Sequence, residues 1–160
     1  MELSDPKSLY TQDIKSKVST PDFHLPWTTH LNLPHVLDIF HDVSLFIVDA
    51  PGHLPGHINL LCRTSETQYV YLGGDACHDR RIMRKERAIG TWEDKEGFTC
   101  CIHADRRKAE ETIERIKGLE ERGVEVIFAH DVEWEQHPKN SGRFFGGSGA
   151  KGKACCTWLY

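Results

Sequence analysis

Short apolar runs, separated by turn-forming residues, mark the middle of this chain of 160 residues. Runs rich in β-branched and aromatic residues occupy Ser44–Asp49, Ile58–Cys62 and Tyr69–Leu72, with Gly, Pro, Ser and Thr between them. Such residues favour the pleated surface of a strand, and the intervening clusters favour turns. The pattern therefore predicts three consecutive strands in an antiparallel run.

A helical period appears further along the chain. Apolar residues recur on one helical face at Ala109, Ile113, Ile116 and Leu119. Asp105 can cap the first turn of this helix, and Gly123 stands where helices commonly end. The spacing predicts an amphipathic helix between these two residues.

The order of the elements indicates a fold class. After the helix, Val124–Phe128 is an apolar run typical of a buried strand, and it leads into Ala129, His130 and Asp131. Three strands, a loop-rich segment, a helix and a further strand are typical of a mixed α/β layer. We expect an antiparallel-rich sheet with the helix covering one face.

The flanking segments lack this periodicity. Residues 1–42 are polar and broken by four prolines, so we expect an irregular N-terminal extension. Residues 79–104 predict a loop-rich insertion, in which the basic stretch Arg80–Arg87 forms a solvated face. From Pro138 the chain is Gly-rich, and residues 138–160 are expected to form a flexible tail.

Composition narrows the classes of partner and location. A net charge of −4 and a pI near 6.2 provide no broad basic surface, so neither nucleic acid nor membrane is expected as a partner. No apolar run reaches about 18 residues, and the first residues lack a secretory signal, which favours a cytoplasmic location. The six cysteines have no C-x-x-C spacing and are expected to be free thiols.

Three residues with metal-binding side chains lie at the ends of predicted strands. His53 follows the first strand, Asp75 follows the third, and His130 follows the last. Strands that end in short loops can hold ligands in fixed geometry. Imidazole nitrogens and carboxylate oxygens are ligands that zinc prefers when it keeps a position open for water. The sequence therefore predicts a metal site at His53, Asp75 and His130.

These positions occur in a specific order of motifs. The string Pro51-Gly-His-Leu-Pro-Gly-His57 is followed by Gly74-Asp75 and then by Phe128-Ala-His-Asp131. This order resembles the latter half of metallo-β-lactamase superfamily proteins, most closely the lactonase-like branch. The resemblance implies that residues 43–137 form a half-domain, which is the C-terminal half of an αββα sandwich.

The resemblance also implies roles for individual residues. Family members bind one or two zinc ions, and the position of His53 binds the first. The position of Asp75 bridges the two ions, and that of His130 completes the second. His57 would hold the turn by hydrogen bonds without binding metal.

One family motif, His-x-His-x-Asp-His, is absent from the 160 residues. The N-terminal histidines are spaced too widely to replace it, and we expect solvent-exposed side chains at His24, His30, His35 and His41. The resemblance then implies an incomplete site with weak metal affinity. One half of the fold alone also leaves a hydrophobic sheet face uncovered, which predicts a homodimer or another partner there.

The resemblance implies one activity and leaves one alternative. The activity is metal-dependent opening of a lactone or lactam, a small cyclic ester or amide, in xenobiotic or secondary-metabolite breakdown. His78 stands where lactonase-like relatives place a tyrosine that touches the substrate carbonyl, and it is expected to donate a proton unless it is an exposed loop histidine. The alternative is a catalytically inactive truncated remnant or an interaction protein.

Overall fold

The computed structural model describes residues 26–143 of the chain. Predictions for His24, for much of the N-terminal extension, for most of the tail and for Cys155 and Cys156 lie outside the described residues. Within that range, no helix has the length and apolarity needed to cross a membrane. The cysteines that the structure describes are free, as predicted; they are Cys62, Cys77, Cys100 and Cys101.

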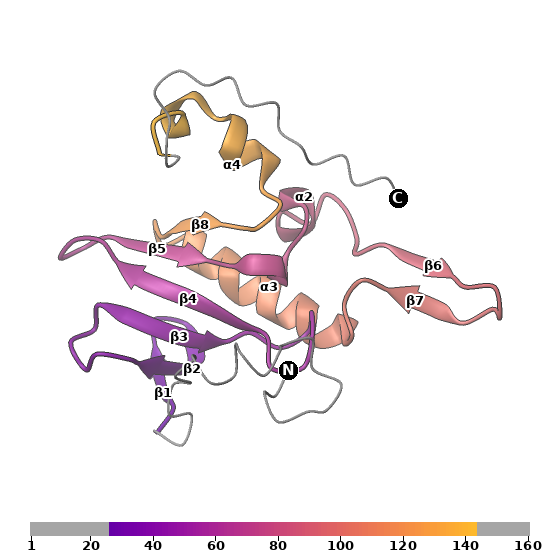
Figure 1. Cartoon of the computed structure of the whole chain (residues 1–160), viewed down its shortest axis with the longest axis horizontal. Helices are drawn as coiled ribbons and strands as arrows, with labels where there is room; N and C mark the ends of the chain where they lie inside the picture. The colour runs from indigo at the N-terminus through magenta and orange to yellow at the C-terminus, as the bar shows by residue number, and fades with distance from the viewer. Residues whose placement is uncertain (1–25, 144–160) are drawn as a thin grey trace, which may run out of the picture.

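A six-stranded sheet forms the centre of the molecule (Figure 1). Its strands lie in the order β1-β2-β3-β4-β5-β8. Neighbours pair antiparallel, except β5 and β8, which pair parallel. The bounds are β1 Thr28–His30, β2 Leu33–Asp38, β3 Leu45–Asp49, β4 Ile58–Arg63, β5 Tyr69–Leu72 and β8 Glu125–Ile127.

The strands predicted from the apolar runs are confirmed as β3, β4 and β5, which are consecutive and antiparallel. Their register places Phe46 opposite Leu61 and Leu61 opposite Tyr71, so these side chains share one face. The last predicted strand is confirmed as β8, which follows the helix and lies beside β5. The mixed α/β layer with an antiparallel-rich sheet is therefore the observed fold.

Helix α3, Arg106–Glu120, covers one face of the sheet (Figure 1). The carboxylate of Asp105 accepts a hydrogen bond from the backbone N–H of Lys108 at 3.0 Å, which caps the first turn. Gly123 has a φ of 85° just past the helix, where the chain reverses. The core between helix and sheet includes Val36, Phe46, Val48, Leu61, Tyr71, Val126, Ala109, Ile113, Ile116 and Leu119.

The opposite face of the sheet carries an apolar row. Successive register pairs align Leu37, Ile47, Leu60, Leu72 and Ile127 across five strands. These side chains point away from α3, because the residues that alternate with them pack in the core beneath the helix. Leu72 is 39% exposed, so part of the row faces solvent.

Residues 28–38 are not irregular, which corrects the prediction for the N-terminal extension. Strands β1 and β2 pair with each other, and β2 pairs with β3. Pro34 obscured this pattern, because proline lacks the N–H that a central strand needs. Proline is tolerated at the start of a strand, and Leu33 and Val36 on either side of it still enter the core.

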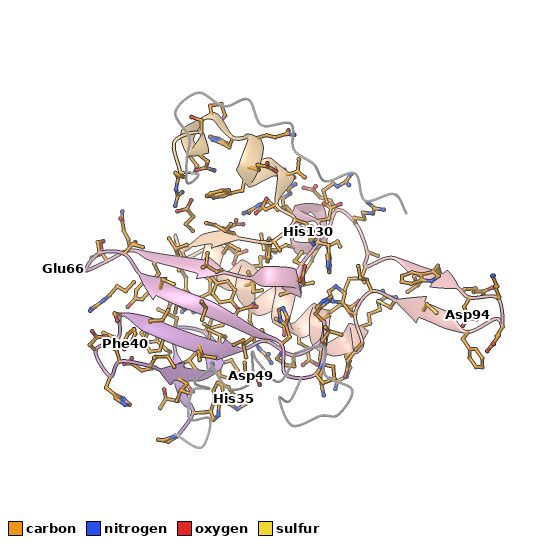
Figure 2. The ribbon with its side chains drawn as sticks, in the orientation of Figure 1. His35, Phe40, Asp49, Glu66, Asp94 and His130 are labelled. Atoms are coloured by element: carbon orange, nitrogen blue, oxygen red, sulfur yellow. The ribbon has the colours of Figure 1, made fainter. Side chains whose placement is uncertain are left out.

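Residues 79–104 are more ordered than the predicted loop-rich insertion. They contain α2, Arg80–Met83, and a hairpin of β6, Thr91–Glu93, and β7, Thr99–Cys101. Met83 and Ile89 join the core, although they follow no helical or strand period in the sequence. The hairpin projects from the body of the molecule, with Asp94 at its tip (Figure 2).

The beginning of the expected flexible tail is also ordered. Helix α4, Val132–Gln136, is followed by a 3-10 turn at Pro138–Asn140. Asn140 is fully buried and donates to the carbonyl of Trp134 at 2.7 Å. These contacts correct the prediction for residues 138–143.

Candidate metal centre

The Pro-Gly-His-Leu-Pro-Gly-His segment leaves β3 as a closed loop. The backbone N–H of Ala50 donates to the carbonyl of His57 at 3.2 Å, and the N–H of His57 donates to the carbonyl of Leu54 at 3.1 Å. The Nδ1 atom of His57 lies 3.3 Å from the carbonyl of Ala50. His57 therefore holds the turn by hydrogen bonds, and the loop presents His53.

The same loop is fixed against the first turns of α3. Gly52 has a φ of 131°, and a Cβ at this position would lie only 2.3 Å from the backbone nitrogen of Ala109. Glycine is therefore required both by the backbone conformation and by the close approach. The hydroxyl of Thr112 donates to the carbonyl of Pro51 at 2.7 Å. These contacts fix the backbone that carries His53.

Asp75 and His130 meet because the ends of two neighbouring strands are joined. Asp75 lies in the 3-10 turn Gly74–Ala76 after β5, and the N–H of Ala129 after β8 donates to the carbonyl of Gly74 at 2.9 Å. As a result, Nε2 of His130 lies 3.1 Å from Oδ1 of Asp75. Both side chains are more than a third exposed, and His130 stands near α2 in Figure 2.

His78 stands between this pair and the loop of His53. Its Nε2 atom lies 3.6 Å from Oδ1 of Asp75, and its ring stacks on that of His130 with centroids 5.5 Å apart. The ring centroid of His53 is 5.3 Å away. The side chain of His78 is only 21% exposed, so it is not the exposed loop histidine of the alternative prediction.

A further histidine, His103, was not expected at the site. The N–H of Ala104 donates to the carbonyl of His53 at 2.9 Å, and the N–H of Asp105 donates to the carbonyl of Gly52 at 2.9 Å. These bonds place the ring centroid of His103 5.5 Å from that of His53 and 5.3 Å from that of His78. The signal in the sequence was a histidine two residues before a helix cap, and it does not indicate which loop that histidine meets.

Burial favours the neutral form of these imidazoles. Desolvation lowers the pKa of His103 to about 4, and the neighbouring rings of His78 and His53 add to the shift. Burial is also the largest cause that lowers the pKa of His53 and of His78, while the carboxylate of Asp75 opposes it. The neutral imidazole is the form that binds a metal ion.

Within the described residues, the ligand-type side chains form two groups whose ligand atoms lie within 4.8 Å of one another. The buried group consists of His53, His78 and His103, and the exposed group consists of Asp75, His78 and His130. His53 therefore shares no group with Asp75 or with His130. The resemblance implies different ions for His53 and His130, but it also implies that Asp75 bridges both, which this grouping does not reproduce. Both groups fit zinc chemically, because the buried group offers three imidazole nitrogens and the exposed group offers two imidazole nitrogens and a carboxylate.

A buried ion pair supports the exposed group from behind. The Nε of Arg80 donates to both carboxylate oxygens of Asp131 at 2.8 and 2.9 Å, and these side chains are 12% and 2% exposed. Asp131 directly follows His130 and caps α4 by accepting from the N–H of Trp134 at 3.0 Å. Arg80 is therefore not part of a solvated face, which corrects the prediction for this residue, whereas the other basic side chains of the stretch are exposed as predicted.

A pocket of about 370 Å³ opens beside the exposed group. Its wall includes His78 and His130, together with the ring of Phe128. Neither His53 nor His103 is part of this wall. A small molecule in the pocket would therefore contact the exposed group, in a volume within the range of small-molecule sites.

The N-terminal histidines of the described range do not join the site. His35 and His41 are exposed, as predicted. His30 is not, because its ring stacks on Phe46 with centroids 4.5 Å apart, and burial lowers its pKa. The prediction of exposure is therefore wrong for His30.

Comparison with known proteins gives matches to parts of longer chains. No family model matches the chain. The cytochrome P450 monooxygenase mpaDE′ of Penicillium brevicompactum is 34% identical in an alignment 111 residues long, which covers 60% of this chain and 13% of that protein. The metallo-hydrolase mfmC of Annulohypoxylon moriforme is 44% identical over 50 residues, which are 30% of this chain and 13% of that protein.

Among solved structures, that of a quorum-quenching N-acyl homoserine lactone lactonase is similar to this chain. It is 24% identical, and the match covers 58% of this chain and 34% of that chain with a TM-score of 0.45. The chain thus spans a small part of the curated relatives and about a third of the lactonase. The match to the metallo-hydrolase, over 50 residues, agrees with the resemblance to metal-dependent hydrolases.

Proposed function

We propose that this chain, which resembles the C-terminal half of metallo-β-lactamase superfamily hydrolases, is a zinc-dependent hydrolase that opens a lactone or lactam ring. The observation that carries the proposal is the contact between Asp75 and His130. A carboxylate oxygen and an imidazole nitrogen lie 3.1 Å apart at adjoining strand ends, beside a pocket. We assign the metal-binding roles to His53, Asp75 and His130.

The chemistry of the proposed reaction is hydrolysis of a carbonyl. Zinc, when bound, lowers the pKa of water and polarises the substrate carbonyl. Asp75 faces the Nε2 atoms of both His130 and His78, so its charge favours these ring orientations. The ring of Phe128 gives the pocket an apolar wall, against which a cyclic substrate can exclude water.

His78 has two possible roles that exclude each other at one nitrogen. As a proton donor it would transfer an N–H proton toward the ring oxygen or nitrogen that leaves. As a ligand it would use the lone pair of a neutral ring, and that nitrogen would carry no proton. A His78→Gln variant that keeps zinc but loses rate supports the donor role, whereas loss of zinc supports the ligand role.

The proposed partners follow from the pocket and the charge. We propose a small cyclic ester or amide from xenobiotic or secondary-metabolite breakdown as substrate, with no role for nucleic acid or membrane. The free thiols in the described range support a reducing, cytoplasmic location. Without His78, the exposed group has only Asp75 and His130, so we expect weak zinc affinity there.

The test uses the whole purified chain loaded with zinc and a panel of γ-lactones and β-lactams. Hydrolysis is followed by the release of acid, with Asp75→Asn and His130→Ala as the site variants. Changes to residues that only hold the metal ligands in place already cost about 10–100-fold, so we expect each ligand variant to lose at least about 100-fold in rate. The exposed His35 serves as the control position, and His35→Ala should match the unaltered chain. Zinc-loaded protein that opens no substrate of the panel contradicts the proposal.

An interaction protein is the second candidate, and the apolar row opposite α3 favours it. Leu60 and Leu72 lie in the middle of that row, and Leu72 is 39% exposed. We propose that a second copy of the chain covers this face. Light scattering after size exclusion should then show a dimer that Leu72→Lys converts to a monomer. A monomer at all concentrations contradicts this candidate.

A further inference from the structure

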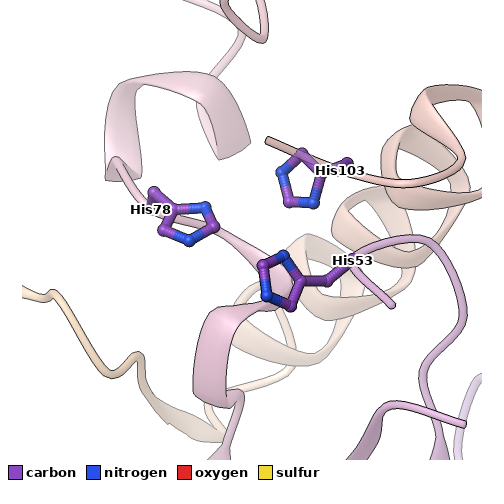
Figure 3. Close-up of side chains that lie close together, drawn as sticks. All are labelled: His53, His78 and His103. Carbon is purple, nitrogen blue, oxygen red and sulfur yellow. The ribbon is translucent and has the colours of Figure 1, made fainter. Parts of the chain in front are cut away.

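Three imidazoles from separate segments converge at the buried group (Figure 3). His53 comes from the loop after β3, His78 from the segment before α2, and His103 from the segment before α3. Their ring centroids are 5.3 to 5.5 Å apart, and the three offer ligand atoms within 4.8 Å of one another. Figure 3 shows the rings facing a common space.

Four of the six ring nitrogens of this group are buried without a hydrogen-bond partner. His103 is 3% exposed, and both of its ring nitrogens are buried and unpaired. The Nδ1 atoms of His53 and His78 are also buried and unpaired. Of the seven such side-chain atoms in residues 26–143, four belong to these three rings. Buried polar atoms in native proteins are nearly always satisfied, so this concentration indicates a ligand-binding site.

The backbone holds the group together before any ligand binds. The N–H groups of Ala104 and Asp105 donate to the carbonyls of His53 and Gly52, each at 2.9 Å. The loop of His53 is in turn pressed onto α3 at Gly52, where no side chain fits. Two of the three rings therefore stand on loops whose main chain is fixed by hydrogen bonds and by the close approach to α3, and such support makes a ligand site rigid.

We propose that His53, His78 and His103 bind one divalent transition-metal ion, with His103 as a ligand that the motif order does not indicate. Three imidazoles with a fourth position open suit zinc, and they suit cobalt or copper as probes. The proposal deepens the proposed function, because His53 belongs to both.

The geometry requires a small adjustment of the rings. Tetrahedral zinc with nitrogen bonds of about 2.0–2.1 Å places its ligand nitrogens about 3.3 Å apart. The nitrogens of the buried group lie within 4.8 Å of one another, so the rings must close by up to about 1.5 Å. Changes of side-chain torsion can supply this movement while the backbone stays fixed.

The exposed group is the competing site, and His78 is common to both. Asp75 and His130 already contact each other at 3.1 Å, and both reach solvent. Their atoms therefore do not require a metal to be satisfied. This difference favours the buried group as the site that holds His78 and the ion.

The test is a titration of the whole chain with cobalt(II), followed by its visible absorption. Loss of a ligand is expected to weaken binding by at least about 100-fold, since changes outside the ligand shell cost about 10–100-fold. His103→Leu replaces the ring with a side chain of similar bulk and should show that loss. Asp75→Asn should keep the tight cobalt site and lose only the weak binding expected at the exposed group, whereas the control His35→Ala should bind cobalt as the unaltered chain does.

The outcomes separate this proposal from the proposed function. Full cobalt binding by His103→Leu, with loss in Asp75→Asn, overturns the buried site even if lactones are hydrolysed. Cobalt lost in His103→Leu, with no hydrolysis by any metal-loaded form, supports the site and rejects the function. An unaltered chain that binds no cobalt overturns the site.

A second measurement covers the case in which His103→Leu does not fold. Copper(II) bound to the unaltered chain is examined by electron paramagnetic resonance, which counts coupled imidazole nitrogens. Three imidazoles support the proposal, because the exposed group can provide only two. A spectrum with one or two imidazoles overturns it.

Discussion

The two ligand groups differ in what each needs from a metal ion. In the buried group, His103 and its neighbours leave four nitrogens without partners. In the exposed group, Asp75 and His130 contact each other, and His130 lines a pocket. An unsatisfied buried polar group costs about 1–3 kcal/mol, so a metal at the buried group stabilises the fold, whereas one at the exposed group mainly serves chemistry. Neighbouring ligand-type residues can thus have separate roles, one group stabilising the fold and the other serving chemistry.

The largest expected effect is a loss of stability in Arg80→Met, next to the exposed group. Arg80→Met leaves the carboxylate of Asp131 buried and unpaired beside His130, and removal of one partner from a buried pair costs about 3–5 kcal/mol. Urea denaturation should show this loss. Arg81→Met is the control, because Arg81 is 53% exposed and pairs with Asp79 at the surface. Equal stability of the two variants contradicts the role given to Arg80.

The next largest effect is the stabilisation of the fold by zinc at the buried group. Zinc at 100 times its dissociation constant should add about 2.7 kcal/mol, which corresponds to a melting temperature about 5–10 °C higher for a chain of this size. Thermal melting with zinc and with a chelator measures this difference. The shift should vanish in His103→Leu and persist in Asp75→Asn. A shift that is lost in Asp75→Asn and kept in His103→Leu would place the stabilising metal at the exposed group.

A smaller loss should follow from the loop that carries His53. Gly52→Ala places a Cβ 2.3 Å from the backbone nitrogen of Ala109, at a φ that L-residues rarely adopt. We expect a cost of about 1–3 kcal/mol together with weaker cobalt binding, since the loop must shift. Gly90→Ala is the matched control, because no atom lies within 4 Å of its added Cβ. Unchanged cobalt affinity in Gly52→Ala would show that the loop does not position the ligand.

The smallest expected effect is a pH-dependent loss of stability from His30, which belongs to neither ligand group. Burial lowers the pKa of His30 below its unfolded value near 6.5, so the unfolded state binds more protons as the pH falls through that value. The contribution of His30 to the stability of the fold should therefore fall below about pH 6.5, equally with and without zinc. Denaturant unfolding of unaltered chain and His30→Phe, from pH 5 to 8, isolates this contribution as their difference. A zinc-dependent difference would link His30 to the metal.

Local pattern in the sequence predicted the elements that depend on local contacts. The strands β3 to β5, the helix α3 and its cap at Asp105 follow from period and capping residues. The turn held by His57 follows from its motif. Strand β2 was missed because Pro34 is normally excluded from paired strands, and its tolerance there depends on its place in the ladder.

The site was predictable in part for the same reason. Asp75 and His130 end neighbouring strands, so their meeting follows from the order of elements. The sequence does not place His103 at the site, because two backbone hydrogen bonds between segments about fifty residues apart bring it beside His53. The burial of Arg80 likewise depends on Asp131, which a basic stretch in the sequence does not indicate.

The most direct measurement is anomalous diffraction at the zinc edge from crystals of the whole chain grown with zinc. The account predicts a peak within bonding distance of nitrogens of His53, His78 and His103, about 2.0–2.1 Å from each. A second, weaker peak beside Asp75 and His130 is compatible with hydrolysis. A peak at Asp75 and His130 alone, with the ring of His103 still unpaired, would contradict the central claim.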